Sequence, residues 1–274
     1  MTSKNALLKV VLFSEFRKGV NDIVLGLKFF NIAFFFAWGD TKARYRRSIL
    51  GPWWIVLSTA VSVAGLGFLW SMLLKDDPVK LVPSLTVGLV VWQLLSGCII
   101  EAPSIFVRNA HFIRNIKLPF FFFLQQLLLR HLIILCHNVV VILVVVTYFG
   151  TGFKVEQFLI IPGLVLVLAN LAWITVLLAM MGSRFRDVEQ IIGAIMPLMF
   201  FLSPVIYRPS QLPFAQAIVW ANPFSYLITL VRDPIMGSAP PLFVYQVSIL
   251  ALLIGSLFTV CQLGKHRQHI SFWL

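Results

Sequence analysis

Charged residues are scarce in this chain. Asp, Glu, Lys and Arg make up 12% of its 274 residues and hydrophobic residues 59%, whereas soluble domains carry roughly 25% charged residues. This composition excludes an ordinary soluble domain and predicts an all-α integral membrane protein. A hydrocarbon core of about 30 Å needs about 20 apolar helical residues per crossing. The chain therefore has room for several crossings but not for a separate catalytic domain.

Cysteines and nucleotide-binding motifs are also lacking. Cys98, Cys136 and Cys261 lie in apolar stretches without the spacing of a metal or disulfide motif, so we expect them to serve packing. The chain has no glycine-rich phosphate loop, since the pair Gly264-Lys265 is followed by His266 and lacks the rest of that motif. We expect no metal site and no cofactor in this chain.

Acidic residues are absent from the centres of the apolar runs. Asp76, Asp77 and Glu156 lie in loops on one side, Asp187 and Glu189 in a loop on the other, and Glu101 at the end of a run. Ion-coupled transporters usually carry ionisable groups at the bilayer centre. The sequence therefore gives little support to ion coupling.

Uncharged runs of spanning length predict six transmembrane helices. A Pro-rich segment, 208–241, separates the last two and is too polar to cross, although 214–220 and 224–231 resemble short helices. It is either a re-entrant segment, shielded by protein, or a pair of helices lying on the outer surface. The predicted transmembrane helices are 53–74, 81–100, 119–149, 158–182, 191–207 and 242–263.

Basic residues set the expected orientation. Sixteen of the 22 Lys and Arg lie in the N-terminal segment, the loops after the second and fourth helices, and the tail, whereas five lie on the opposite side. Cytoplasmic loops carry the excess of basic residues, so both termini should face the cytoplasm and the number of crossings should be even. The net charge of +12 thus indicates a membrane surface and no nucleic acid.

The segment 1–52 precedes the first predicted crossing. Apolar residues recur at helical spacing through 7–38 with Lys and Arg between them, a pattern typical of a helix that lies along the membrane interface. The alternative is a helix that packs on its neighbours without a functional role, because amphipathicity by itself reports only one wet side.

Two sets of polar residues invite a functional interpretation. Arg130 either meets an anionic part of a substrate or reaches the interface from inside a helix. Arg108, His111 and Arg114 recur every three residues and should share a helical face. No carboxylate is at hand to orient the histidine, so a docking surface is favoured over a catalytic cluster.

Several motifs together resemble a known family. Arg44 to Trp54 enters the first crossing, Arg184 to Val188 forms an inner loop, Asn222 to Gly237 follows the fifth crossing, and Phe272-Trp273 closes the tail. In this order they resemble ABC-2 type permeases that export polysaccharides, most closely the membrane subunits for lipid-linked O-antigen.

This resemblance implies the ABC-2, or type V exporter, fold and a place in the bacterial inner membrane. It implies a homodimer around a central pore, two copies of a separate ABC ATPase that bind ATP and Mg²⁺, and a lipid-linked polysaccharide substrate. Capsule and teichoic-acid exporters are close alternatives. A membrane transferase or scramblase that needs no ATP, and an ABC-2 permease for a drug or lipid, are further ones.

The resemblance also assigns residues to roles. The aromatic residues proposed for the channel have a second interpretation as interface anchors, and the arginines proposed for pyrophosphate have one as positive-inside anchors. The implied ATPase-coupling residues are Arg108, His111, Arg114, Arg184, Arg186, Asp187 and Glu189; those for pyrophosphate at the inner mouth are Arg44, Arg46 and Arg47; those lining the channel are Trp53, Trp54, Ser58, Ser62, Phe200, Phe201 and Tyr207; and those of the outer gate are Asn222, Phe224, Tyr226 and Arg232.

Overall fold

The computed structural model describes residues 2–74, 77–150, 152, 154–208 and 216–274, and this part of the chain contains helices and no strands. Lys75 and Asp76 of the predicted loop, and 209–215 of the predicted re-entrant segment, lie outside the described residues. The helices are α1 (Thr2–Lys28), α2 (Phe30–Arg44), α3 (Trp53–Leu74), α4 (Pro78–Glu101), α5 (Ile105–Arg108), α6 (Ala110–Asn115), α7 (Phe120–Tyr148), α8 (Ile160–Arg184), α9 (Asp187–Leu202), α10 (Gln216–Ala221), α11 (Pro223–Ile235) and α12 (Leu242–Trp273), with short 3₁₀ turns at Ala102–Ser104 and Val155–Leu159.

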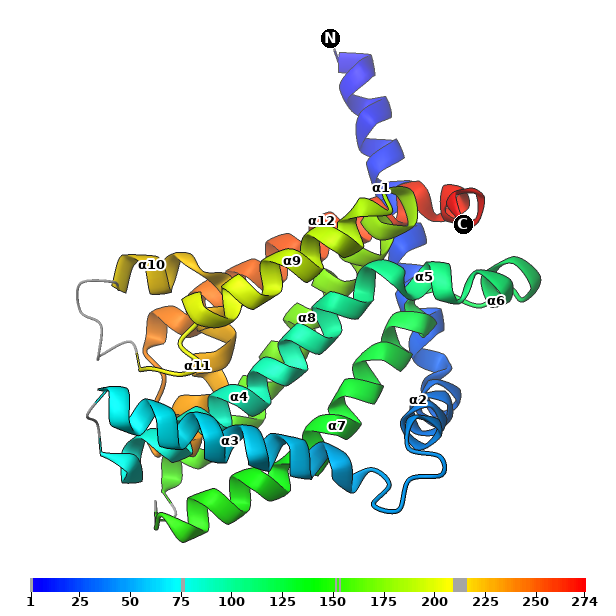
Figure 1. The fold of residues 1–274 in the computed structure, drawn as a ribbon. Coiled ribbons are helices and arrows are strands. Elements are labelled where there is room, and N and C mark those ends of the chain that lie inside the picture. The colour runs from blue at the N-terminus through cyan, green and yellow to red at the C-terminus, as the bar shows by residue number, and fades with distance from the viewer. Residues whose placement is uncertain (1, 75–76, 151, 153, 209–215) are drawn as a thin grey trace.

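Long helices run side by side from one end of the molecule to the other (Figure 1). Among the described residues, the helices over five of the six predicted ranges are long and apolar enough to cross a membrane: those of α3, α4, α7, α8 and α12. The C-terminus lies at the end of the bundle that holds α5 and α6, and α1 projects from the same end toward the N-terminus (Figure 1). That placement agrees with an even number of passes through the bundle.

The fifth predicted crossing, 191–207, is wrong at both of its ends. The helix found there, α9, begins at Asp187 and ends at Leu202, and its 16 residues make it shorter than the other crossing candidates. Pro204 explains the early end, because the residue before a proline is pushed out of helical backbone. Ser203 accordingly has extended backbone, with φ −86° and ψ 149°. Tyr207 therefore lies beyond the helix on which it was predicted.

The N-terminal segment is two helices. α1 and α2 meet at Phe29 with a bend of 66°. Taken together they are also long and apolar enough to cross a membrane as one broken span. α1 packs across α12, where a Cβ added at Gly264 would collide with the carbonyl of Glu15. α2 packs on α7 instead. A single straight helix cannot follow both partners, so the predicted continuous amphipathic helix is replaced by a bent pair.

Neighbouring helices differ in how much of their surface is covered. α4 lies between α3, α7, α9 and α11. Of the most apolar stretch of its span 72% is buried, compared with 22% for α3. α3 buries only a narrow stripe, Ile55, Thr59, Val63 and Gly67, at a spacing of four residues. Its remaining surface, including Trp53 and Trp54, is open within this single chain.

The short helices α10 and α11 lie at the end of the bundle away from the termini (Figure 1). α11 packs on α4, α8 and α12 and buries Ser225 and the run Leu227 to Arg232. It is thus inserted among the long helices. A helix lying on an outer surface would leave one side free of protein.

Candidate functional site

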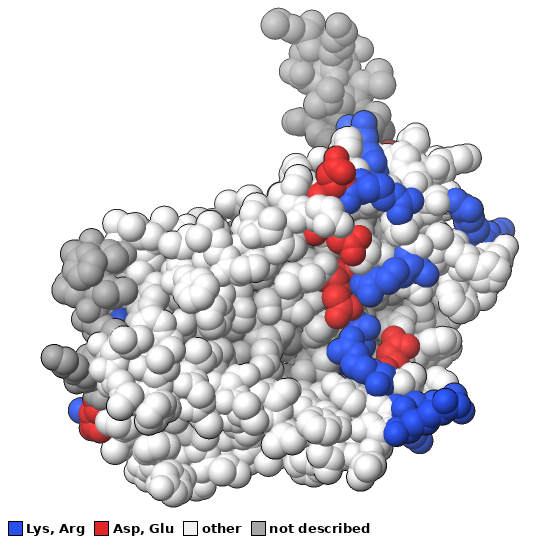
Figure 2. Space-filling view, in the orientation of Figure 1, with Lys and Arg blue, Asp and Glu red and all other residues white. Residues whose placement is uncertain are grey.

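Charged side chains gather toward one end of the molecule, and most of the remaining visible face is uncharged (Figure 2). We call this the charged end, and it contains the end of α2, α5, α6, the α8–α9 turn and the end of α12. The opposite end contains α10, α11 and the α7–α8 connection. The predicted site residues divide between these two ends and the apolar face that joins them.

Arg108, His111 and Arg114 do not share one helical face. Asn109 interrupts the helix, so Arg108 ends α5 while His111 and Arg114 belong to α6. The Arg108 guanidinium turns back and donates to the carbonyl oxygen of Glu101 at 3.0 Å. The expectation of a shared face assumed an unbroken helix, which the Asn109 break removes. None of the residues of α6 is buried, so this helix remains an exposed surface element.

Arg184 to Glu189 does not form a separate short helix. Arg184 ends α8 and Asp187 begins α9, and only Phe185 and Arg186 stand between them. Asp187 and Glu189 occupy the first turn of α9, where negative charge interacts favourably with the helix dipole. The four predicted residues of this segment are all exposed, on a tight turn.

The last turn of α12 supports this α8–α9 turn. The Arg184 guanidinium lies over the rings of Trp273, at 5.6 Å, and Phe185, at 5.1 Å. Trp273 also packs on His266 and His269 of its own helix. The sequence showed the terminal aromatic pair but gave no sign that Trp273 meets Arg184, because 89 positions separate them.

A buried carboxylate joins three helices near the charged end. Asp22 of α1 is 0% exposed, accepts the backbone N–H of Phe121 at 3.0 Å and pairs with Arg267 of α12 at 3.1 Å. Burial raises the pKa of Asp22 above its usual value, and the Phe121 N–H and Arg267 oppose that rise. Asp22 thus caps the first turn of α7 and ties α1 to α12, a role that the sequence did not reveal.

Arg130 has an acidic partner. Its guanidinium forms an ion pair with Glu101 at the end of α4, and the other oxygen of Glu101 lies 3.3 Å from His131 Nε2. An unpaired charged side chain near the membrane has a high free-energy cost. The sequence therefore already gave a reason to expect Glu101 and Arg130 to pair. The ion pair shows that Arg130 is bound within the protein and does not simply extend toward the interface.

A cavity of about 580 Å³ opens between α2, α5, α6 and α7. Arg44, Arg108 and Arg130 line it together with apolar rings, Phe36 and Phe122 among them. Of the three arginines predicted for pyrophosphate, this cavity includes only Arg44. Arg46 and Arg47 lie exposed in the turn after α2, where Arg47 has the left-handed backbone φ of 71°.

The predicted channel residues of α3 share its open side. Trp53, Trp54, Ser58 and Ser62 are all exposed. The two serine hydroxyls donate to backbone carbonyls of their own helix, Ser58 to Ile55 and Ser62 to Ser58, each at 2.9 Å. Their oxygens keep a free acceptor side, so a passing ligand meets aromatic faces and hydroxyl acceptors here.

The predicted channel residues of α9 are less uniform. Phe201 is exposed, while Phe200 is half-buried and packs edge-on against Trp92 of α4. Tyr207 lies past the end of α9 and donates from its hydroxyl to the carbonyl oxygen of Leu202 at 2.9 Å. Phe201 alone of these three presents an open ring, and the channel role of all three stays a prediction.

Arg232 and Asn222 hold the segment that follows α9. Arg232 is 2% exposed and donates to the carbonyl oxygens of Pro204 and Tyr207. Asn222 caps α11 by accepting the Phe224 N–H at 3.0 Å, and its amide donates to Ser203 at 2.9 Å. Irregular backbone inside a membrane protein needs such internal partners. Both residues are therefore anchors of the 203–207 segment in this conformation.

Phe224 packs α11 on α4, and Tyr226 joins α11 to α10. The Phe224 ring meets Trp92 at 5.6 Å, and the Tyr226 hydroxyl donates to the Trp220 carbonyl at 2.7 Å. Next to Arg232, burial raises the pKa of Asp233, and the guanidinium opposes that rise. The four predicted gate residues, Asn222, Phe224, Tyr226 and Arg232, all belong to α11 or its N-cap, at the opposite end.

One polar network was missed by the sequence analysis. Gln93 of α4 exchanges hydrogen bonds with Thr59 of α3, at 3.1 Å from its amide nitrogen, and accepts from Asn138 of α7 at 2.7 Å. Thr59 and Asn138 are buried. The network holds α3 against the bundle.

No group of three or more His, Cys, Asp or Glu within the described residues could bind a metal ion.

Comparison with known proteins agrees with this architecture. The sequence model of the ABC-2 type transporter family matches residues 33–236, well over half of the chain. The chain is also similar to the O-antigen export system permease protein RfbA of Klebsiella pneumoniae, with 23% identity over 201 residues, which cover 72% of this chain and 77% of that protein. With its apolar helices it is an integral membrane protein. The chain belongs to the ABC-2 type transporter family.

Proposed function

We propose that this chain is the permease subunit of an ATP-driven exporter that moves lipid-linked polysaccharide, of the O-antigen kind, across the bacterial inner membrane to the periplasm. The similarity to an O-antigen export permease over most of its length supports this substrate class. The concentration of basic residues at the charged end supports a cytoplasmic location for that end and both termini.

The observation that carries the proposal is the exposed charged surface formed by α6 and the α8–α9 turn. His111 and Arg114 on α6, and Arg186 and Asp187 on the turn, are all exposed at the end that holds both termini. Two copies of a separate ATPase dock on this surface and supply ATP hydrolysis. The stack of Arg184 on Trp273 links the docked turn to α12, so a push from the ATPase reaches a long helix.

Substrate enters at the charged end. Arg44 at the 580 Å³ cavity offers paired donors to phosphate oxygens, and Arg108 and Arg130, which also bind Glu101, add positive charge to the lining. Arg46 and Arg47 anchor the neighbouring turn at the lipid surface. The apolar rings of the cavity accommodate the first part of a lipid chain. The pyrophosphate of a lipid carrier has the charge and size for this site.

The glycan passes along the open sides of α3 and α9. In a homodimer these two surfaces face their counterparts in the second copy and enclose a pore. Aromatic faces such as Trp53, Trp54 and Phe201 bind sugars without selecting one hydroxyl pattern, which suits a moving chain. The group of Asn222, Phe224, Tyr226 and Arg232 closes the pore at the far end in the resting state.

The docking surface provides the test. Replacing Arg186 and Asp187 by Ala should abolish co-purification of the ATPase subunit while lowering the unfolding temperature of the permease by no more than about 4 °C, because both side chains are exposed and Asp187 contributes only its interaction with the dipole of α9. Replacing Lys28 and Lys265 by Gln provides a control with the same number of changes at the same end. Unchanged ATPase retention in the R186A/D187A variant would contradict the proposal.

A further inference from the structure

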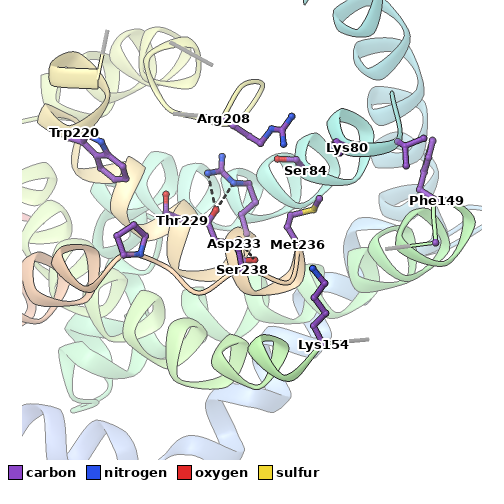
Figure 3. A pocket seen from close by; sticks show the side chains of 14 residues that line it. Lys80, Ser84, Phe149, Lys154, Arg208, Trp220, Thr229, Asp233, Met236 and Ser238 are labelled. Carbon is purple, nitrogen blue, oxygen red and sulfur yellow. Dashed lines mark hydrogen bonds and ion pairs between the residues drawn. The ribbon is translucent and has the colours of Figure 1, made fainter. Parts of the chain in front are cut away.

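Basic residues are rare at the end opposite to the termini, and those present converge. Five lie on that side of the sequence: Lys75, Lys80, Lys154, Arg208 and Arg232. Lys75 lies outside the described residues, and the other four all line one pocket of about 600 Å³ (Figure 3). The positive-inside tendency disfavours cations on this side. Their gathering in one cavity therefore points to a function.

The four cations come from four separate parts of the chain. Lys80 lies in the first turn of α4, Lys154 in the α7–α8 connection, Arg208 after α9 and Arg232 in α11. Figure 3 shows the Arg208 side chain ending close to Ser84, and Lys154 approaching from below toward Met236. No local sequence pattern brings these positions together; the packing of α11 against α4 and α8 does.

The charge of the pocket is unbalanced. Among its described lining residues Asp233 is the one acid, and it pairs with Arg232 at 3.1 Å. Lys154 makes a long contact of 3.4 Å with the Gly237 carbonyl, and Lys80 is exposed. Lys80 and Lys154 form no ion pair among the described residues, so their two positive charges are not offset there. A cleft lined by one sign of charge concentrates oppositely charged ligands.

The rest of the lining suits a carbohydrate. The pocket contains the hydroxyls of Ser84, Thr229 and Ser238 and the rings of Trp220 and Phe149. The Thr229 side chain is 1% exposed, and its hydroxyl has no hydrogen-bond partner in the structure. A buried hydroxyl without a partner is unfavourable, and a ligand hydroxyl or anion in the pocket would satisfy it. Aromatic faces and hydroxyls provide the apolar and polar contacts that a sugar needs.

We propose that this pocket binds a sugar unit that carries a phosphate or carboxylate group. The anion binds Lys80 and Lys154, and the sugar ring lies toward Thr229 and Trp220. The identification of that unit as part of the exported chain rests on the proposed function. In that setting the pocket holds acidic residues of the glycan as they leave the far end of the pore.

Binding to the purified full-length protein tests the pocket directly. In nanodiscs of phosphatidylcholine we expect glucose 1-phosphate to bind saturably, glucose and inorganic phosphate to bind at least tenfold more weakly, and K80Q/K154Q to lower glucose 1-phosphate affinity at least tenfold. The K28Q/K265Q variant, which removes two charges at the charged end, should keep wild-type affinity. Equal affinity in K80Q/K154Q, or equally tight binding of glucose or of inorganic phosphate, would overturn the proposal.

A second binding experiment, with an anionic lipid, distinguishes a sugar phosphate from a lipid headgroup as the ligand of the pocket. Nanodiscs that contain phosphatidylglycerol should leave glucose 1-phosphate affinity within twofold. Competitive displacement by this lipid would reassign the pocket to lipid headgroups and overturn the sugar assignment.

An export experiment with an acidic and a neutral glycan distinguishes a failure of this inference from a failure of the proposed function. K80Q/K154Q should reduce surface display of an acidic glycan several-fold and spare a neutral glycan, whereas R186A/D187A should abolish both. Loss of both glycans in K80Q/K154Q would contradict the pocket's selectivity. If wild type exports neither glycan, the proposed function fails, while the binding experiment still decides the pocket.

Discussion

The partly buried Arg130 and the buried Arg232 show how differently the two ends of this molecule accommodate an arginine inside the helix bundle. Arg130, near the charged end, pairs with the Glu101 carboxylate and borders a cavity. Arg232, at the opposite end, pairs with its neighbour Asp233 and also binds the backbone carbonyls of Pro204 and Tyr207. The first joins side chains of two helices, and the second supports a length of irregular backbone. The same residue type therefore contributes differently to stability and to function.

The largest effect is expected from Arg232→Leu. The change leaves two carbonyl oxygens without this donor and the Asp233 carboxylate without its partner, so the free energy of unfolding should fall by about 3–5 kcal/mol. Denaturant unfolding in detergent micelles measures this. Arg114→Leu on exposed α6 is the matched control, with a change below about 0.5 kcal/mol. Equal effects of the two changes would remove the contrast between the ends.

A smaller effect is expected at Glu101 and Arg130, since their surroundings are partly hydrated. Glu101→Gln and Arg130→Met should each lower the free energy of unfolding by about 2 kcal/mol, because the first leaves Arg130 without its carboxylate and the second leaves Glu101 with only its longer contacts to Arg108 and His131. The double variant should lose clearly less than the sum of the two, with a coupling of about 1 kcal/mol or more. Strict additivity in the same unfolding assay would show that the ion pair does not contribute.

Asp22→Ala should have an effect of about 1–2 kcal/mol, in the range of a lost helix cap. The variant removes the acceptor for the Phe121 N–H and the partner of Arg267. Hydrogen exchange should accelerate in Ser14 to Lys28 and in the first turn of α7, while α3 stays protected. If exchange in α1 does not change, Asp22 does not hold this helix to the bundle.

The smallest effect on stability belongs to Trp273→Ala. The contact with Arg184 is partly exposed, and an exposed cation–π pair contributes about 0.5–1 kcal/mol. Under the proposed function the variant should nevertheless reduce the ATPase activity of the complex at least twofold, because the α8–α9 turn loses its link to α12. Trp273→Phe should retain most of that activity. Full activity in Trp273→Ala would separate the stack from coupling.

Apolar length predicted most of the helices. The positions of α3, α4, α7, α8 and α12 follow from uncharged runs of spanning length, and two short helices were expected where α10 and α11 lie. The early end of α9 could have been predicted from Pro204, whose effect on Ser203 is local. The bend at Phe29 could not, because it depends on α1 and α2 packing against different helices.

The site was harder to predict, because its parts lie far apart in the sequence. The exposure of Arg114, Arg186 and Asp187 follows from their place in charged loops, whereas the partners of Arg108 and Arg232 depend on how helix ends meet. Hydropathy also does not distinguish α3 from α4, although one is an outer helix with an open aromatic side and the other lies inside the bundle. The buried Asp22 reads in the sequence as one more charge of an amphipathic helix.

Transport by the purified permease, with and without its ATPase, provides the decisive measurement. In proteoliposomes loaded with a lipid-linked glycan, the proposed function predicts translocation only when the ATPase subunit, ATP and Mg²⁺ are all present, and none for the permease alone. Hydrolysis of ATP by the permease alone, or equally rapid translocation of the glycan without the ATPase, would contradict it.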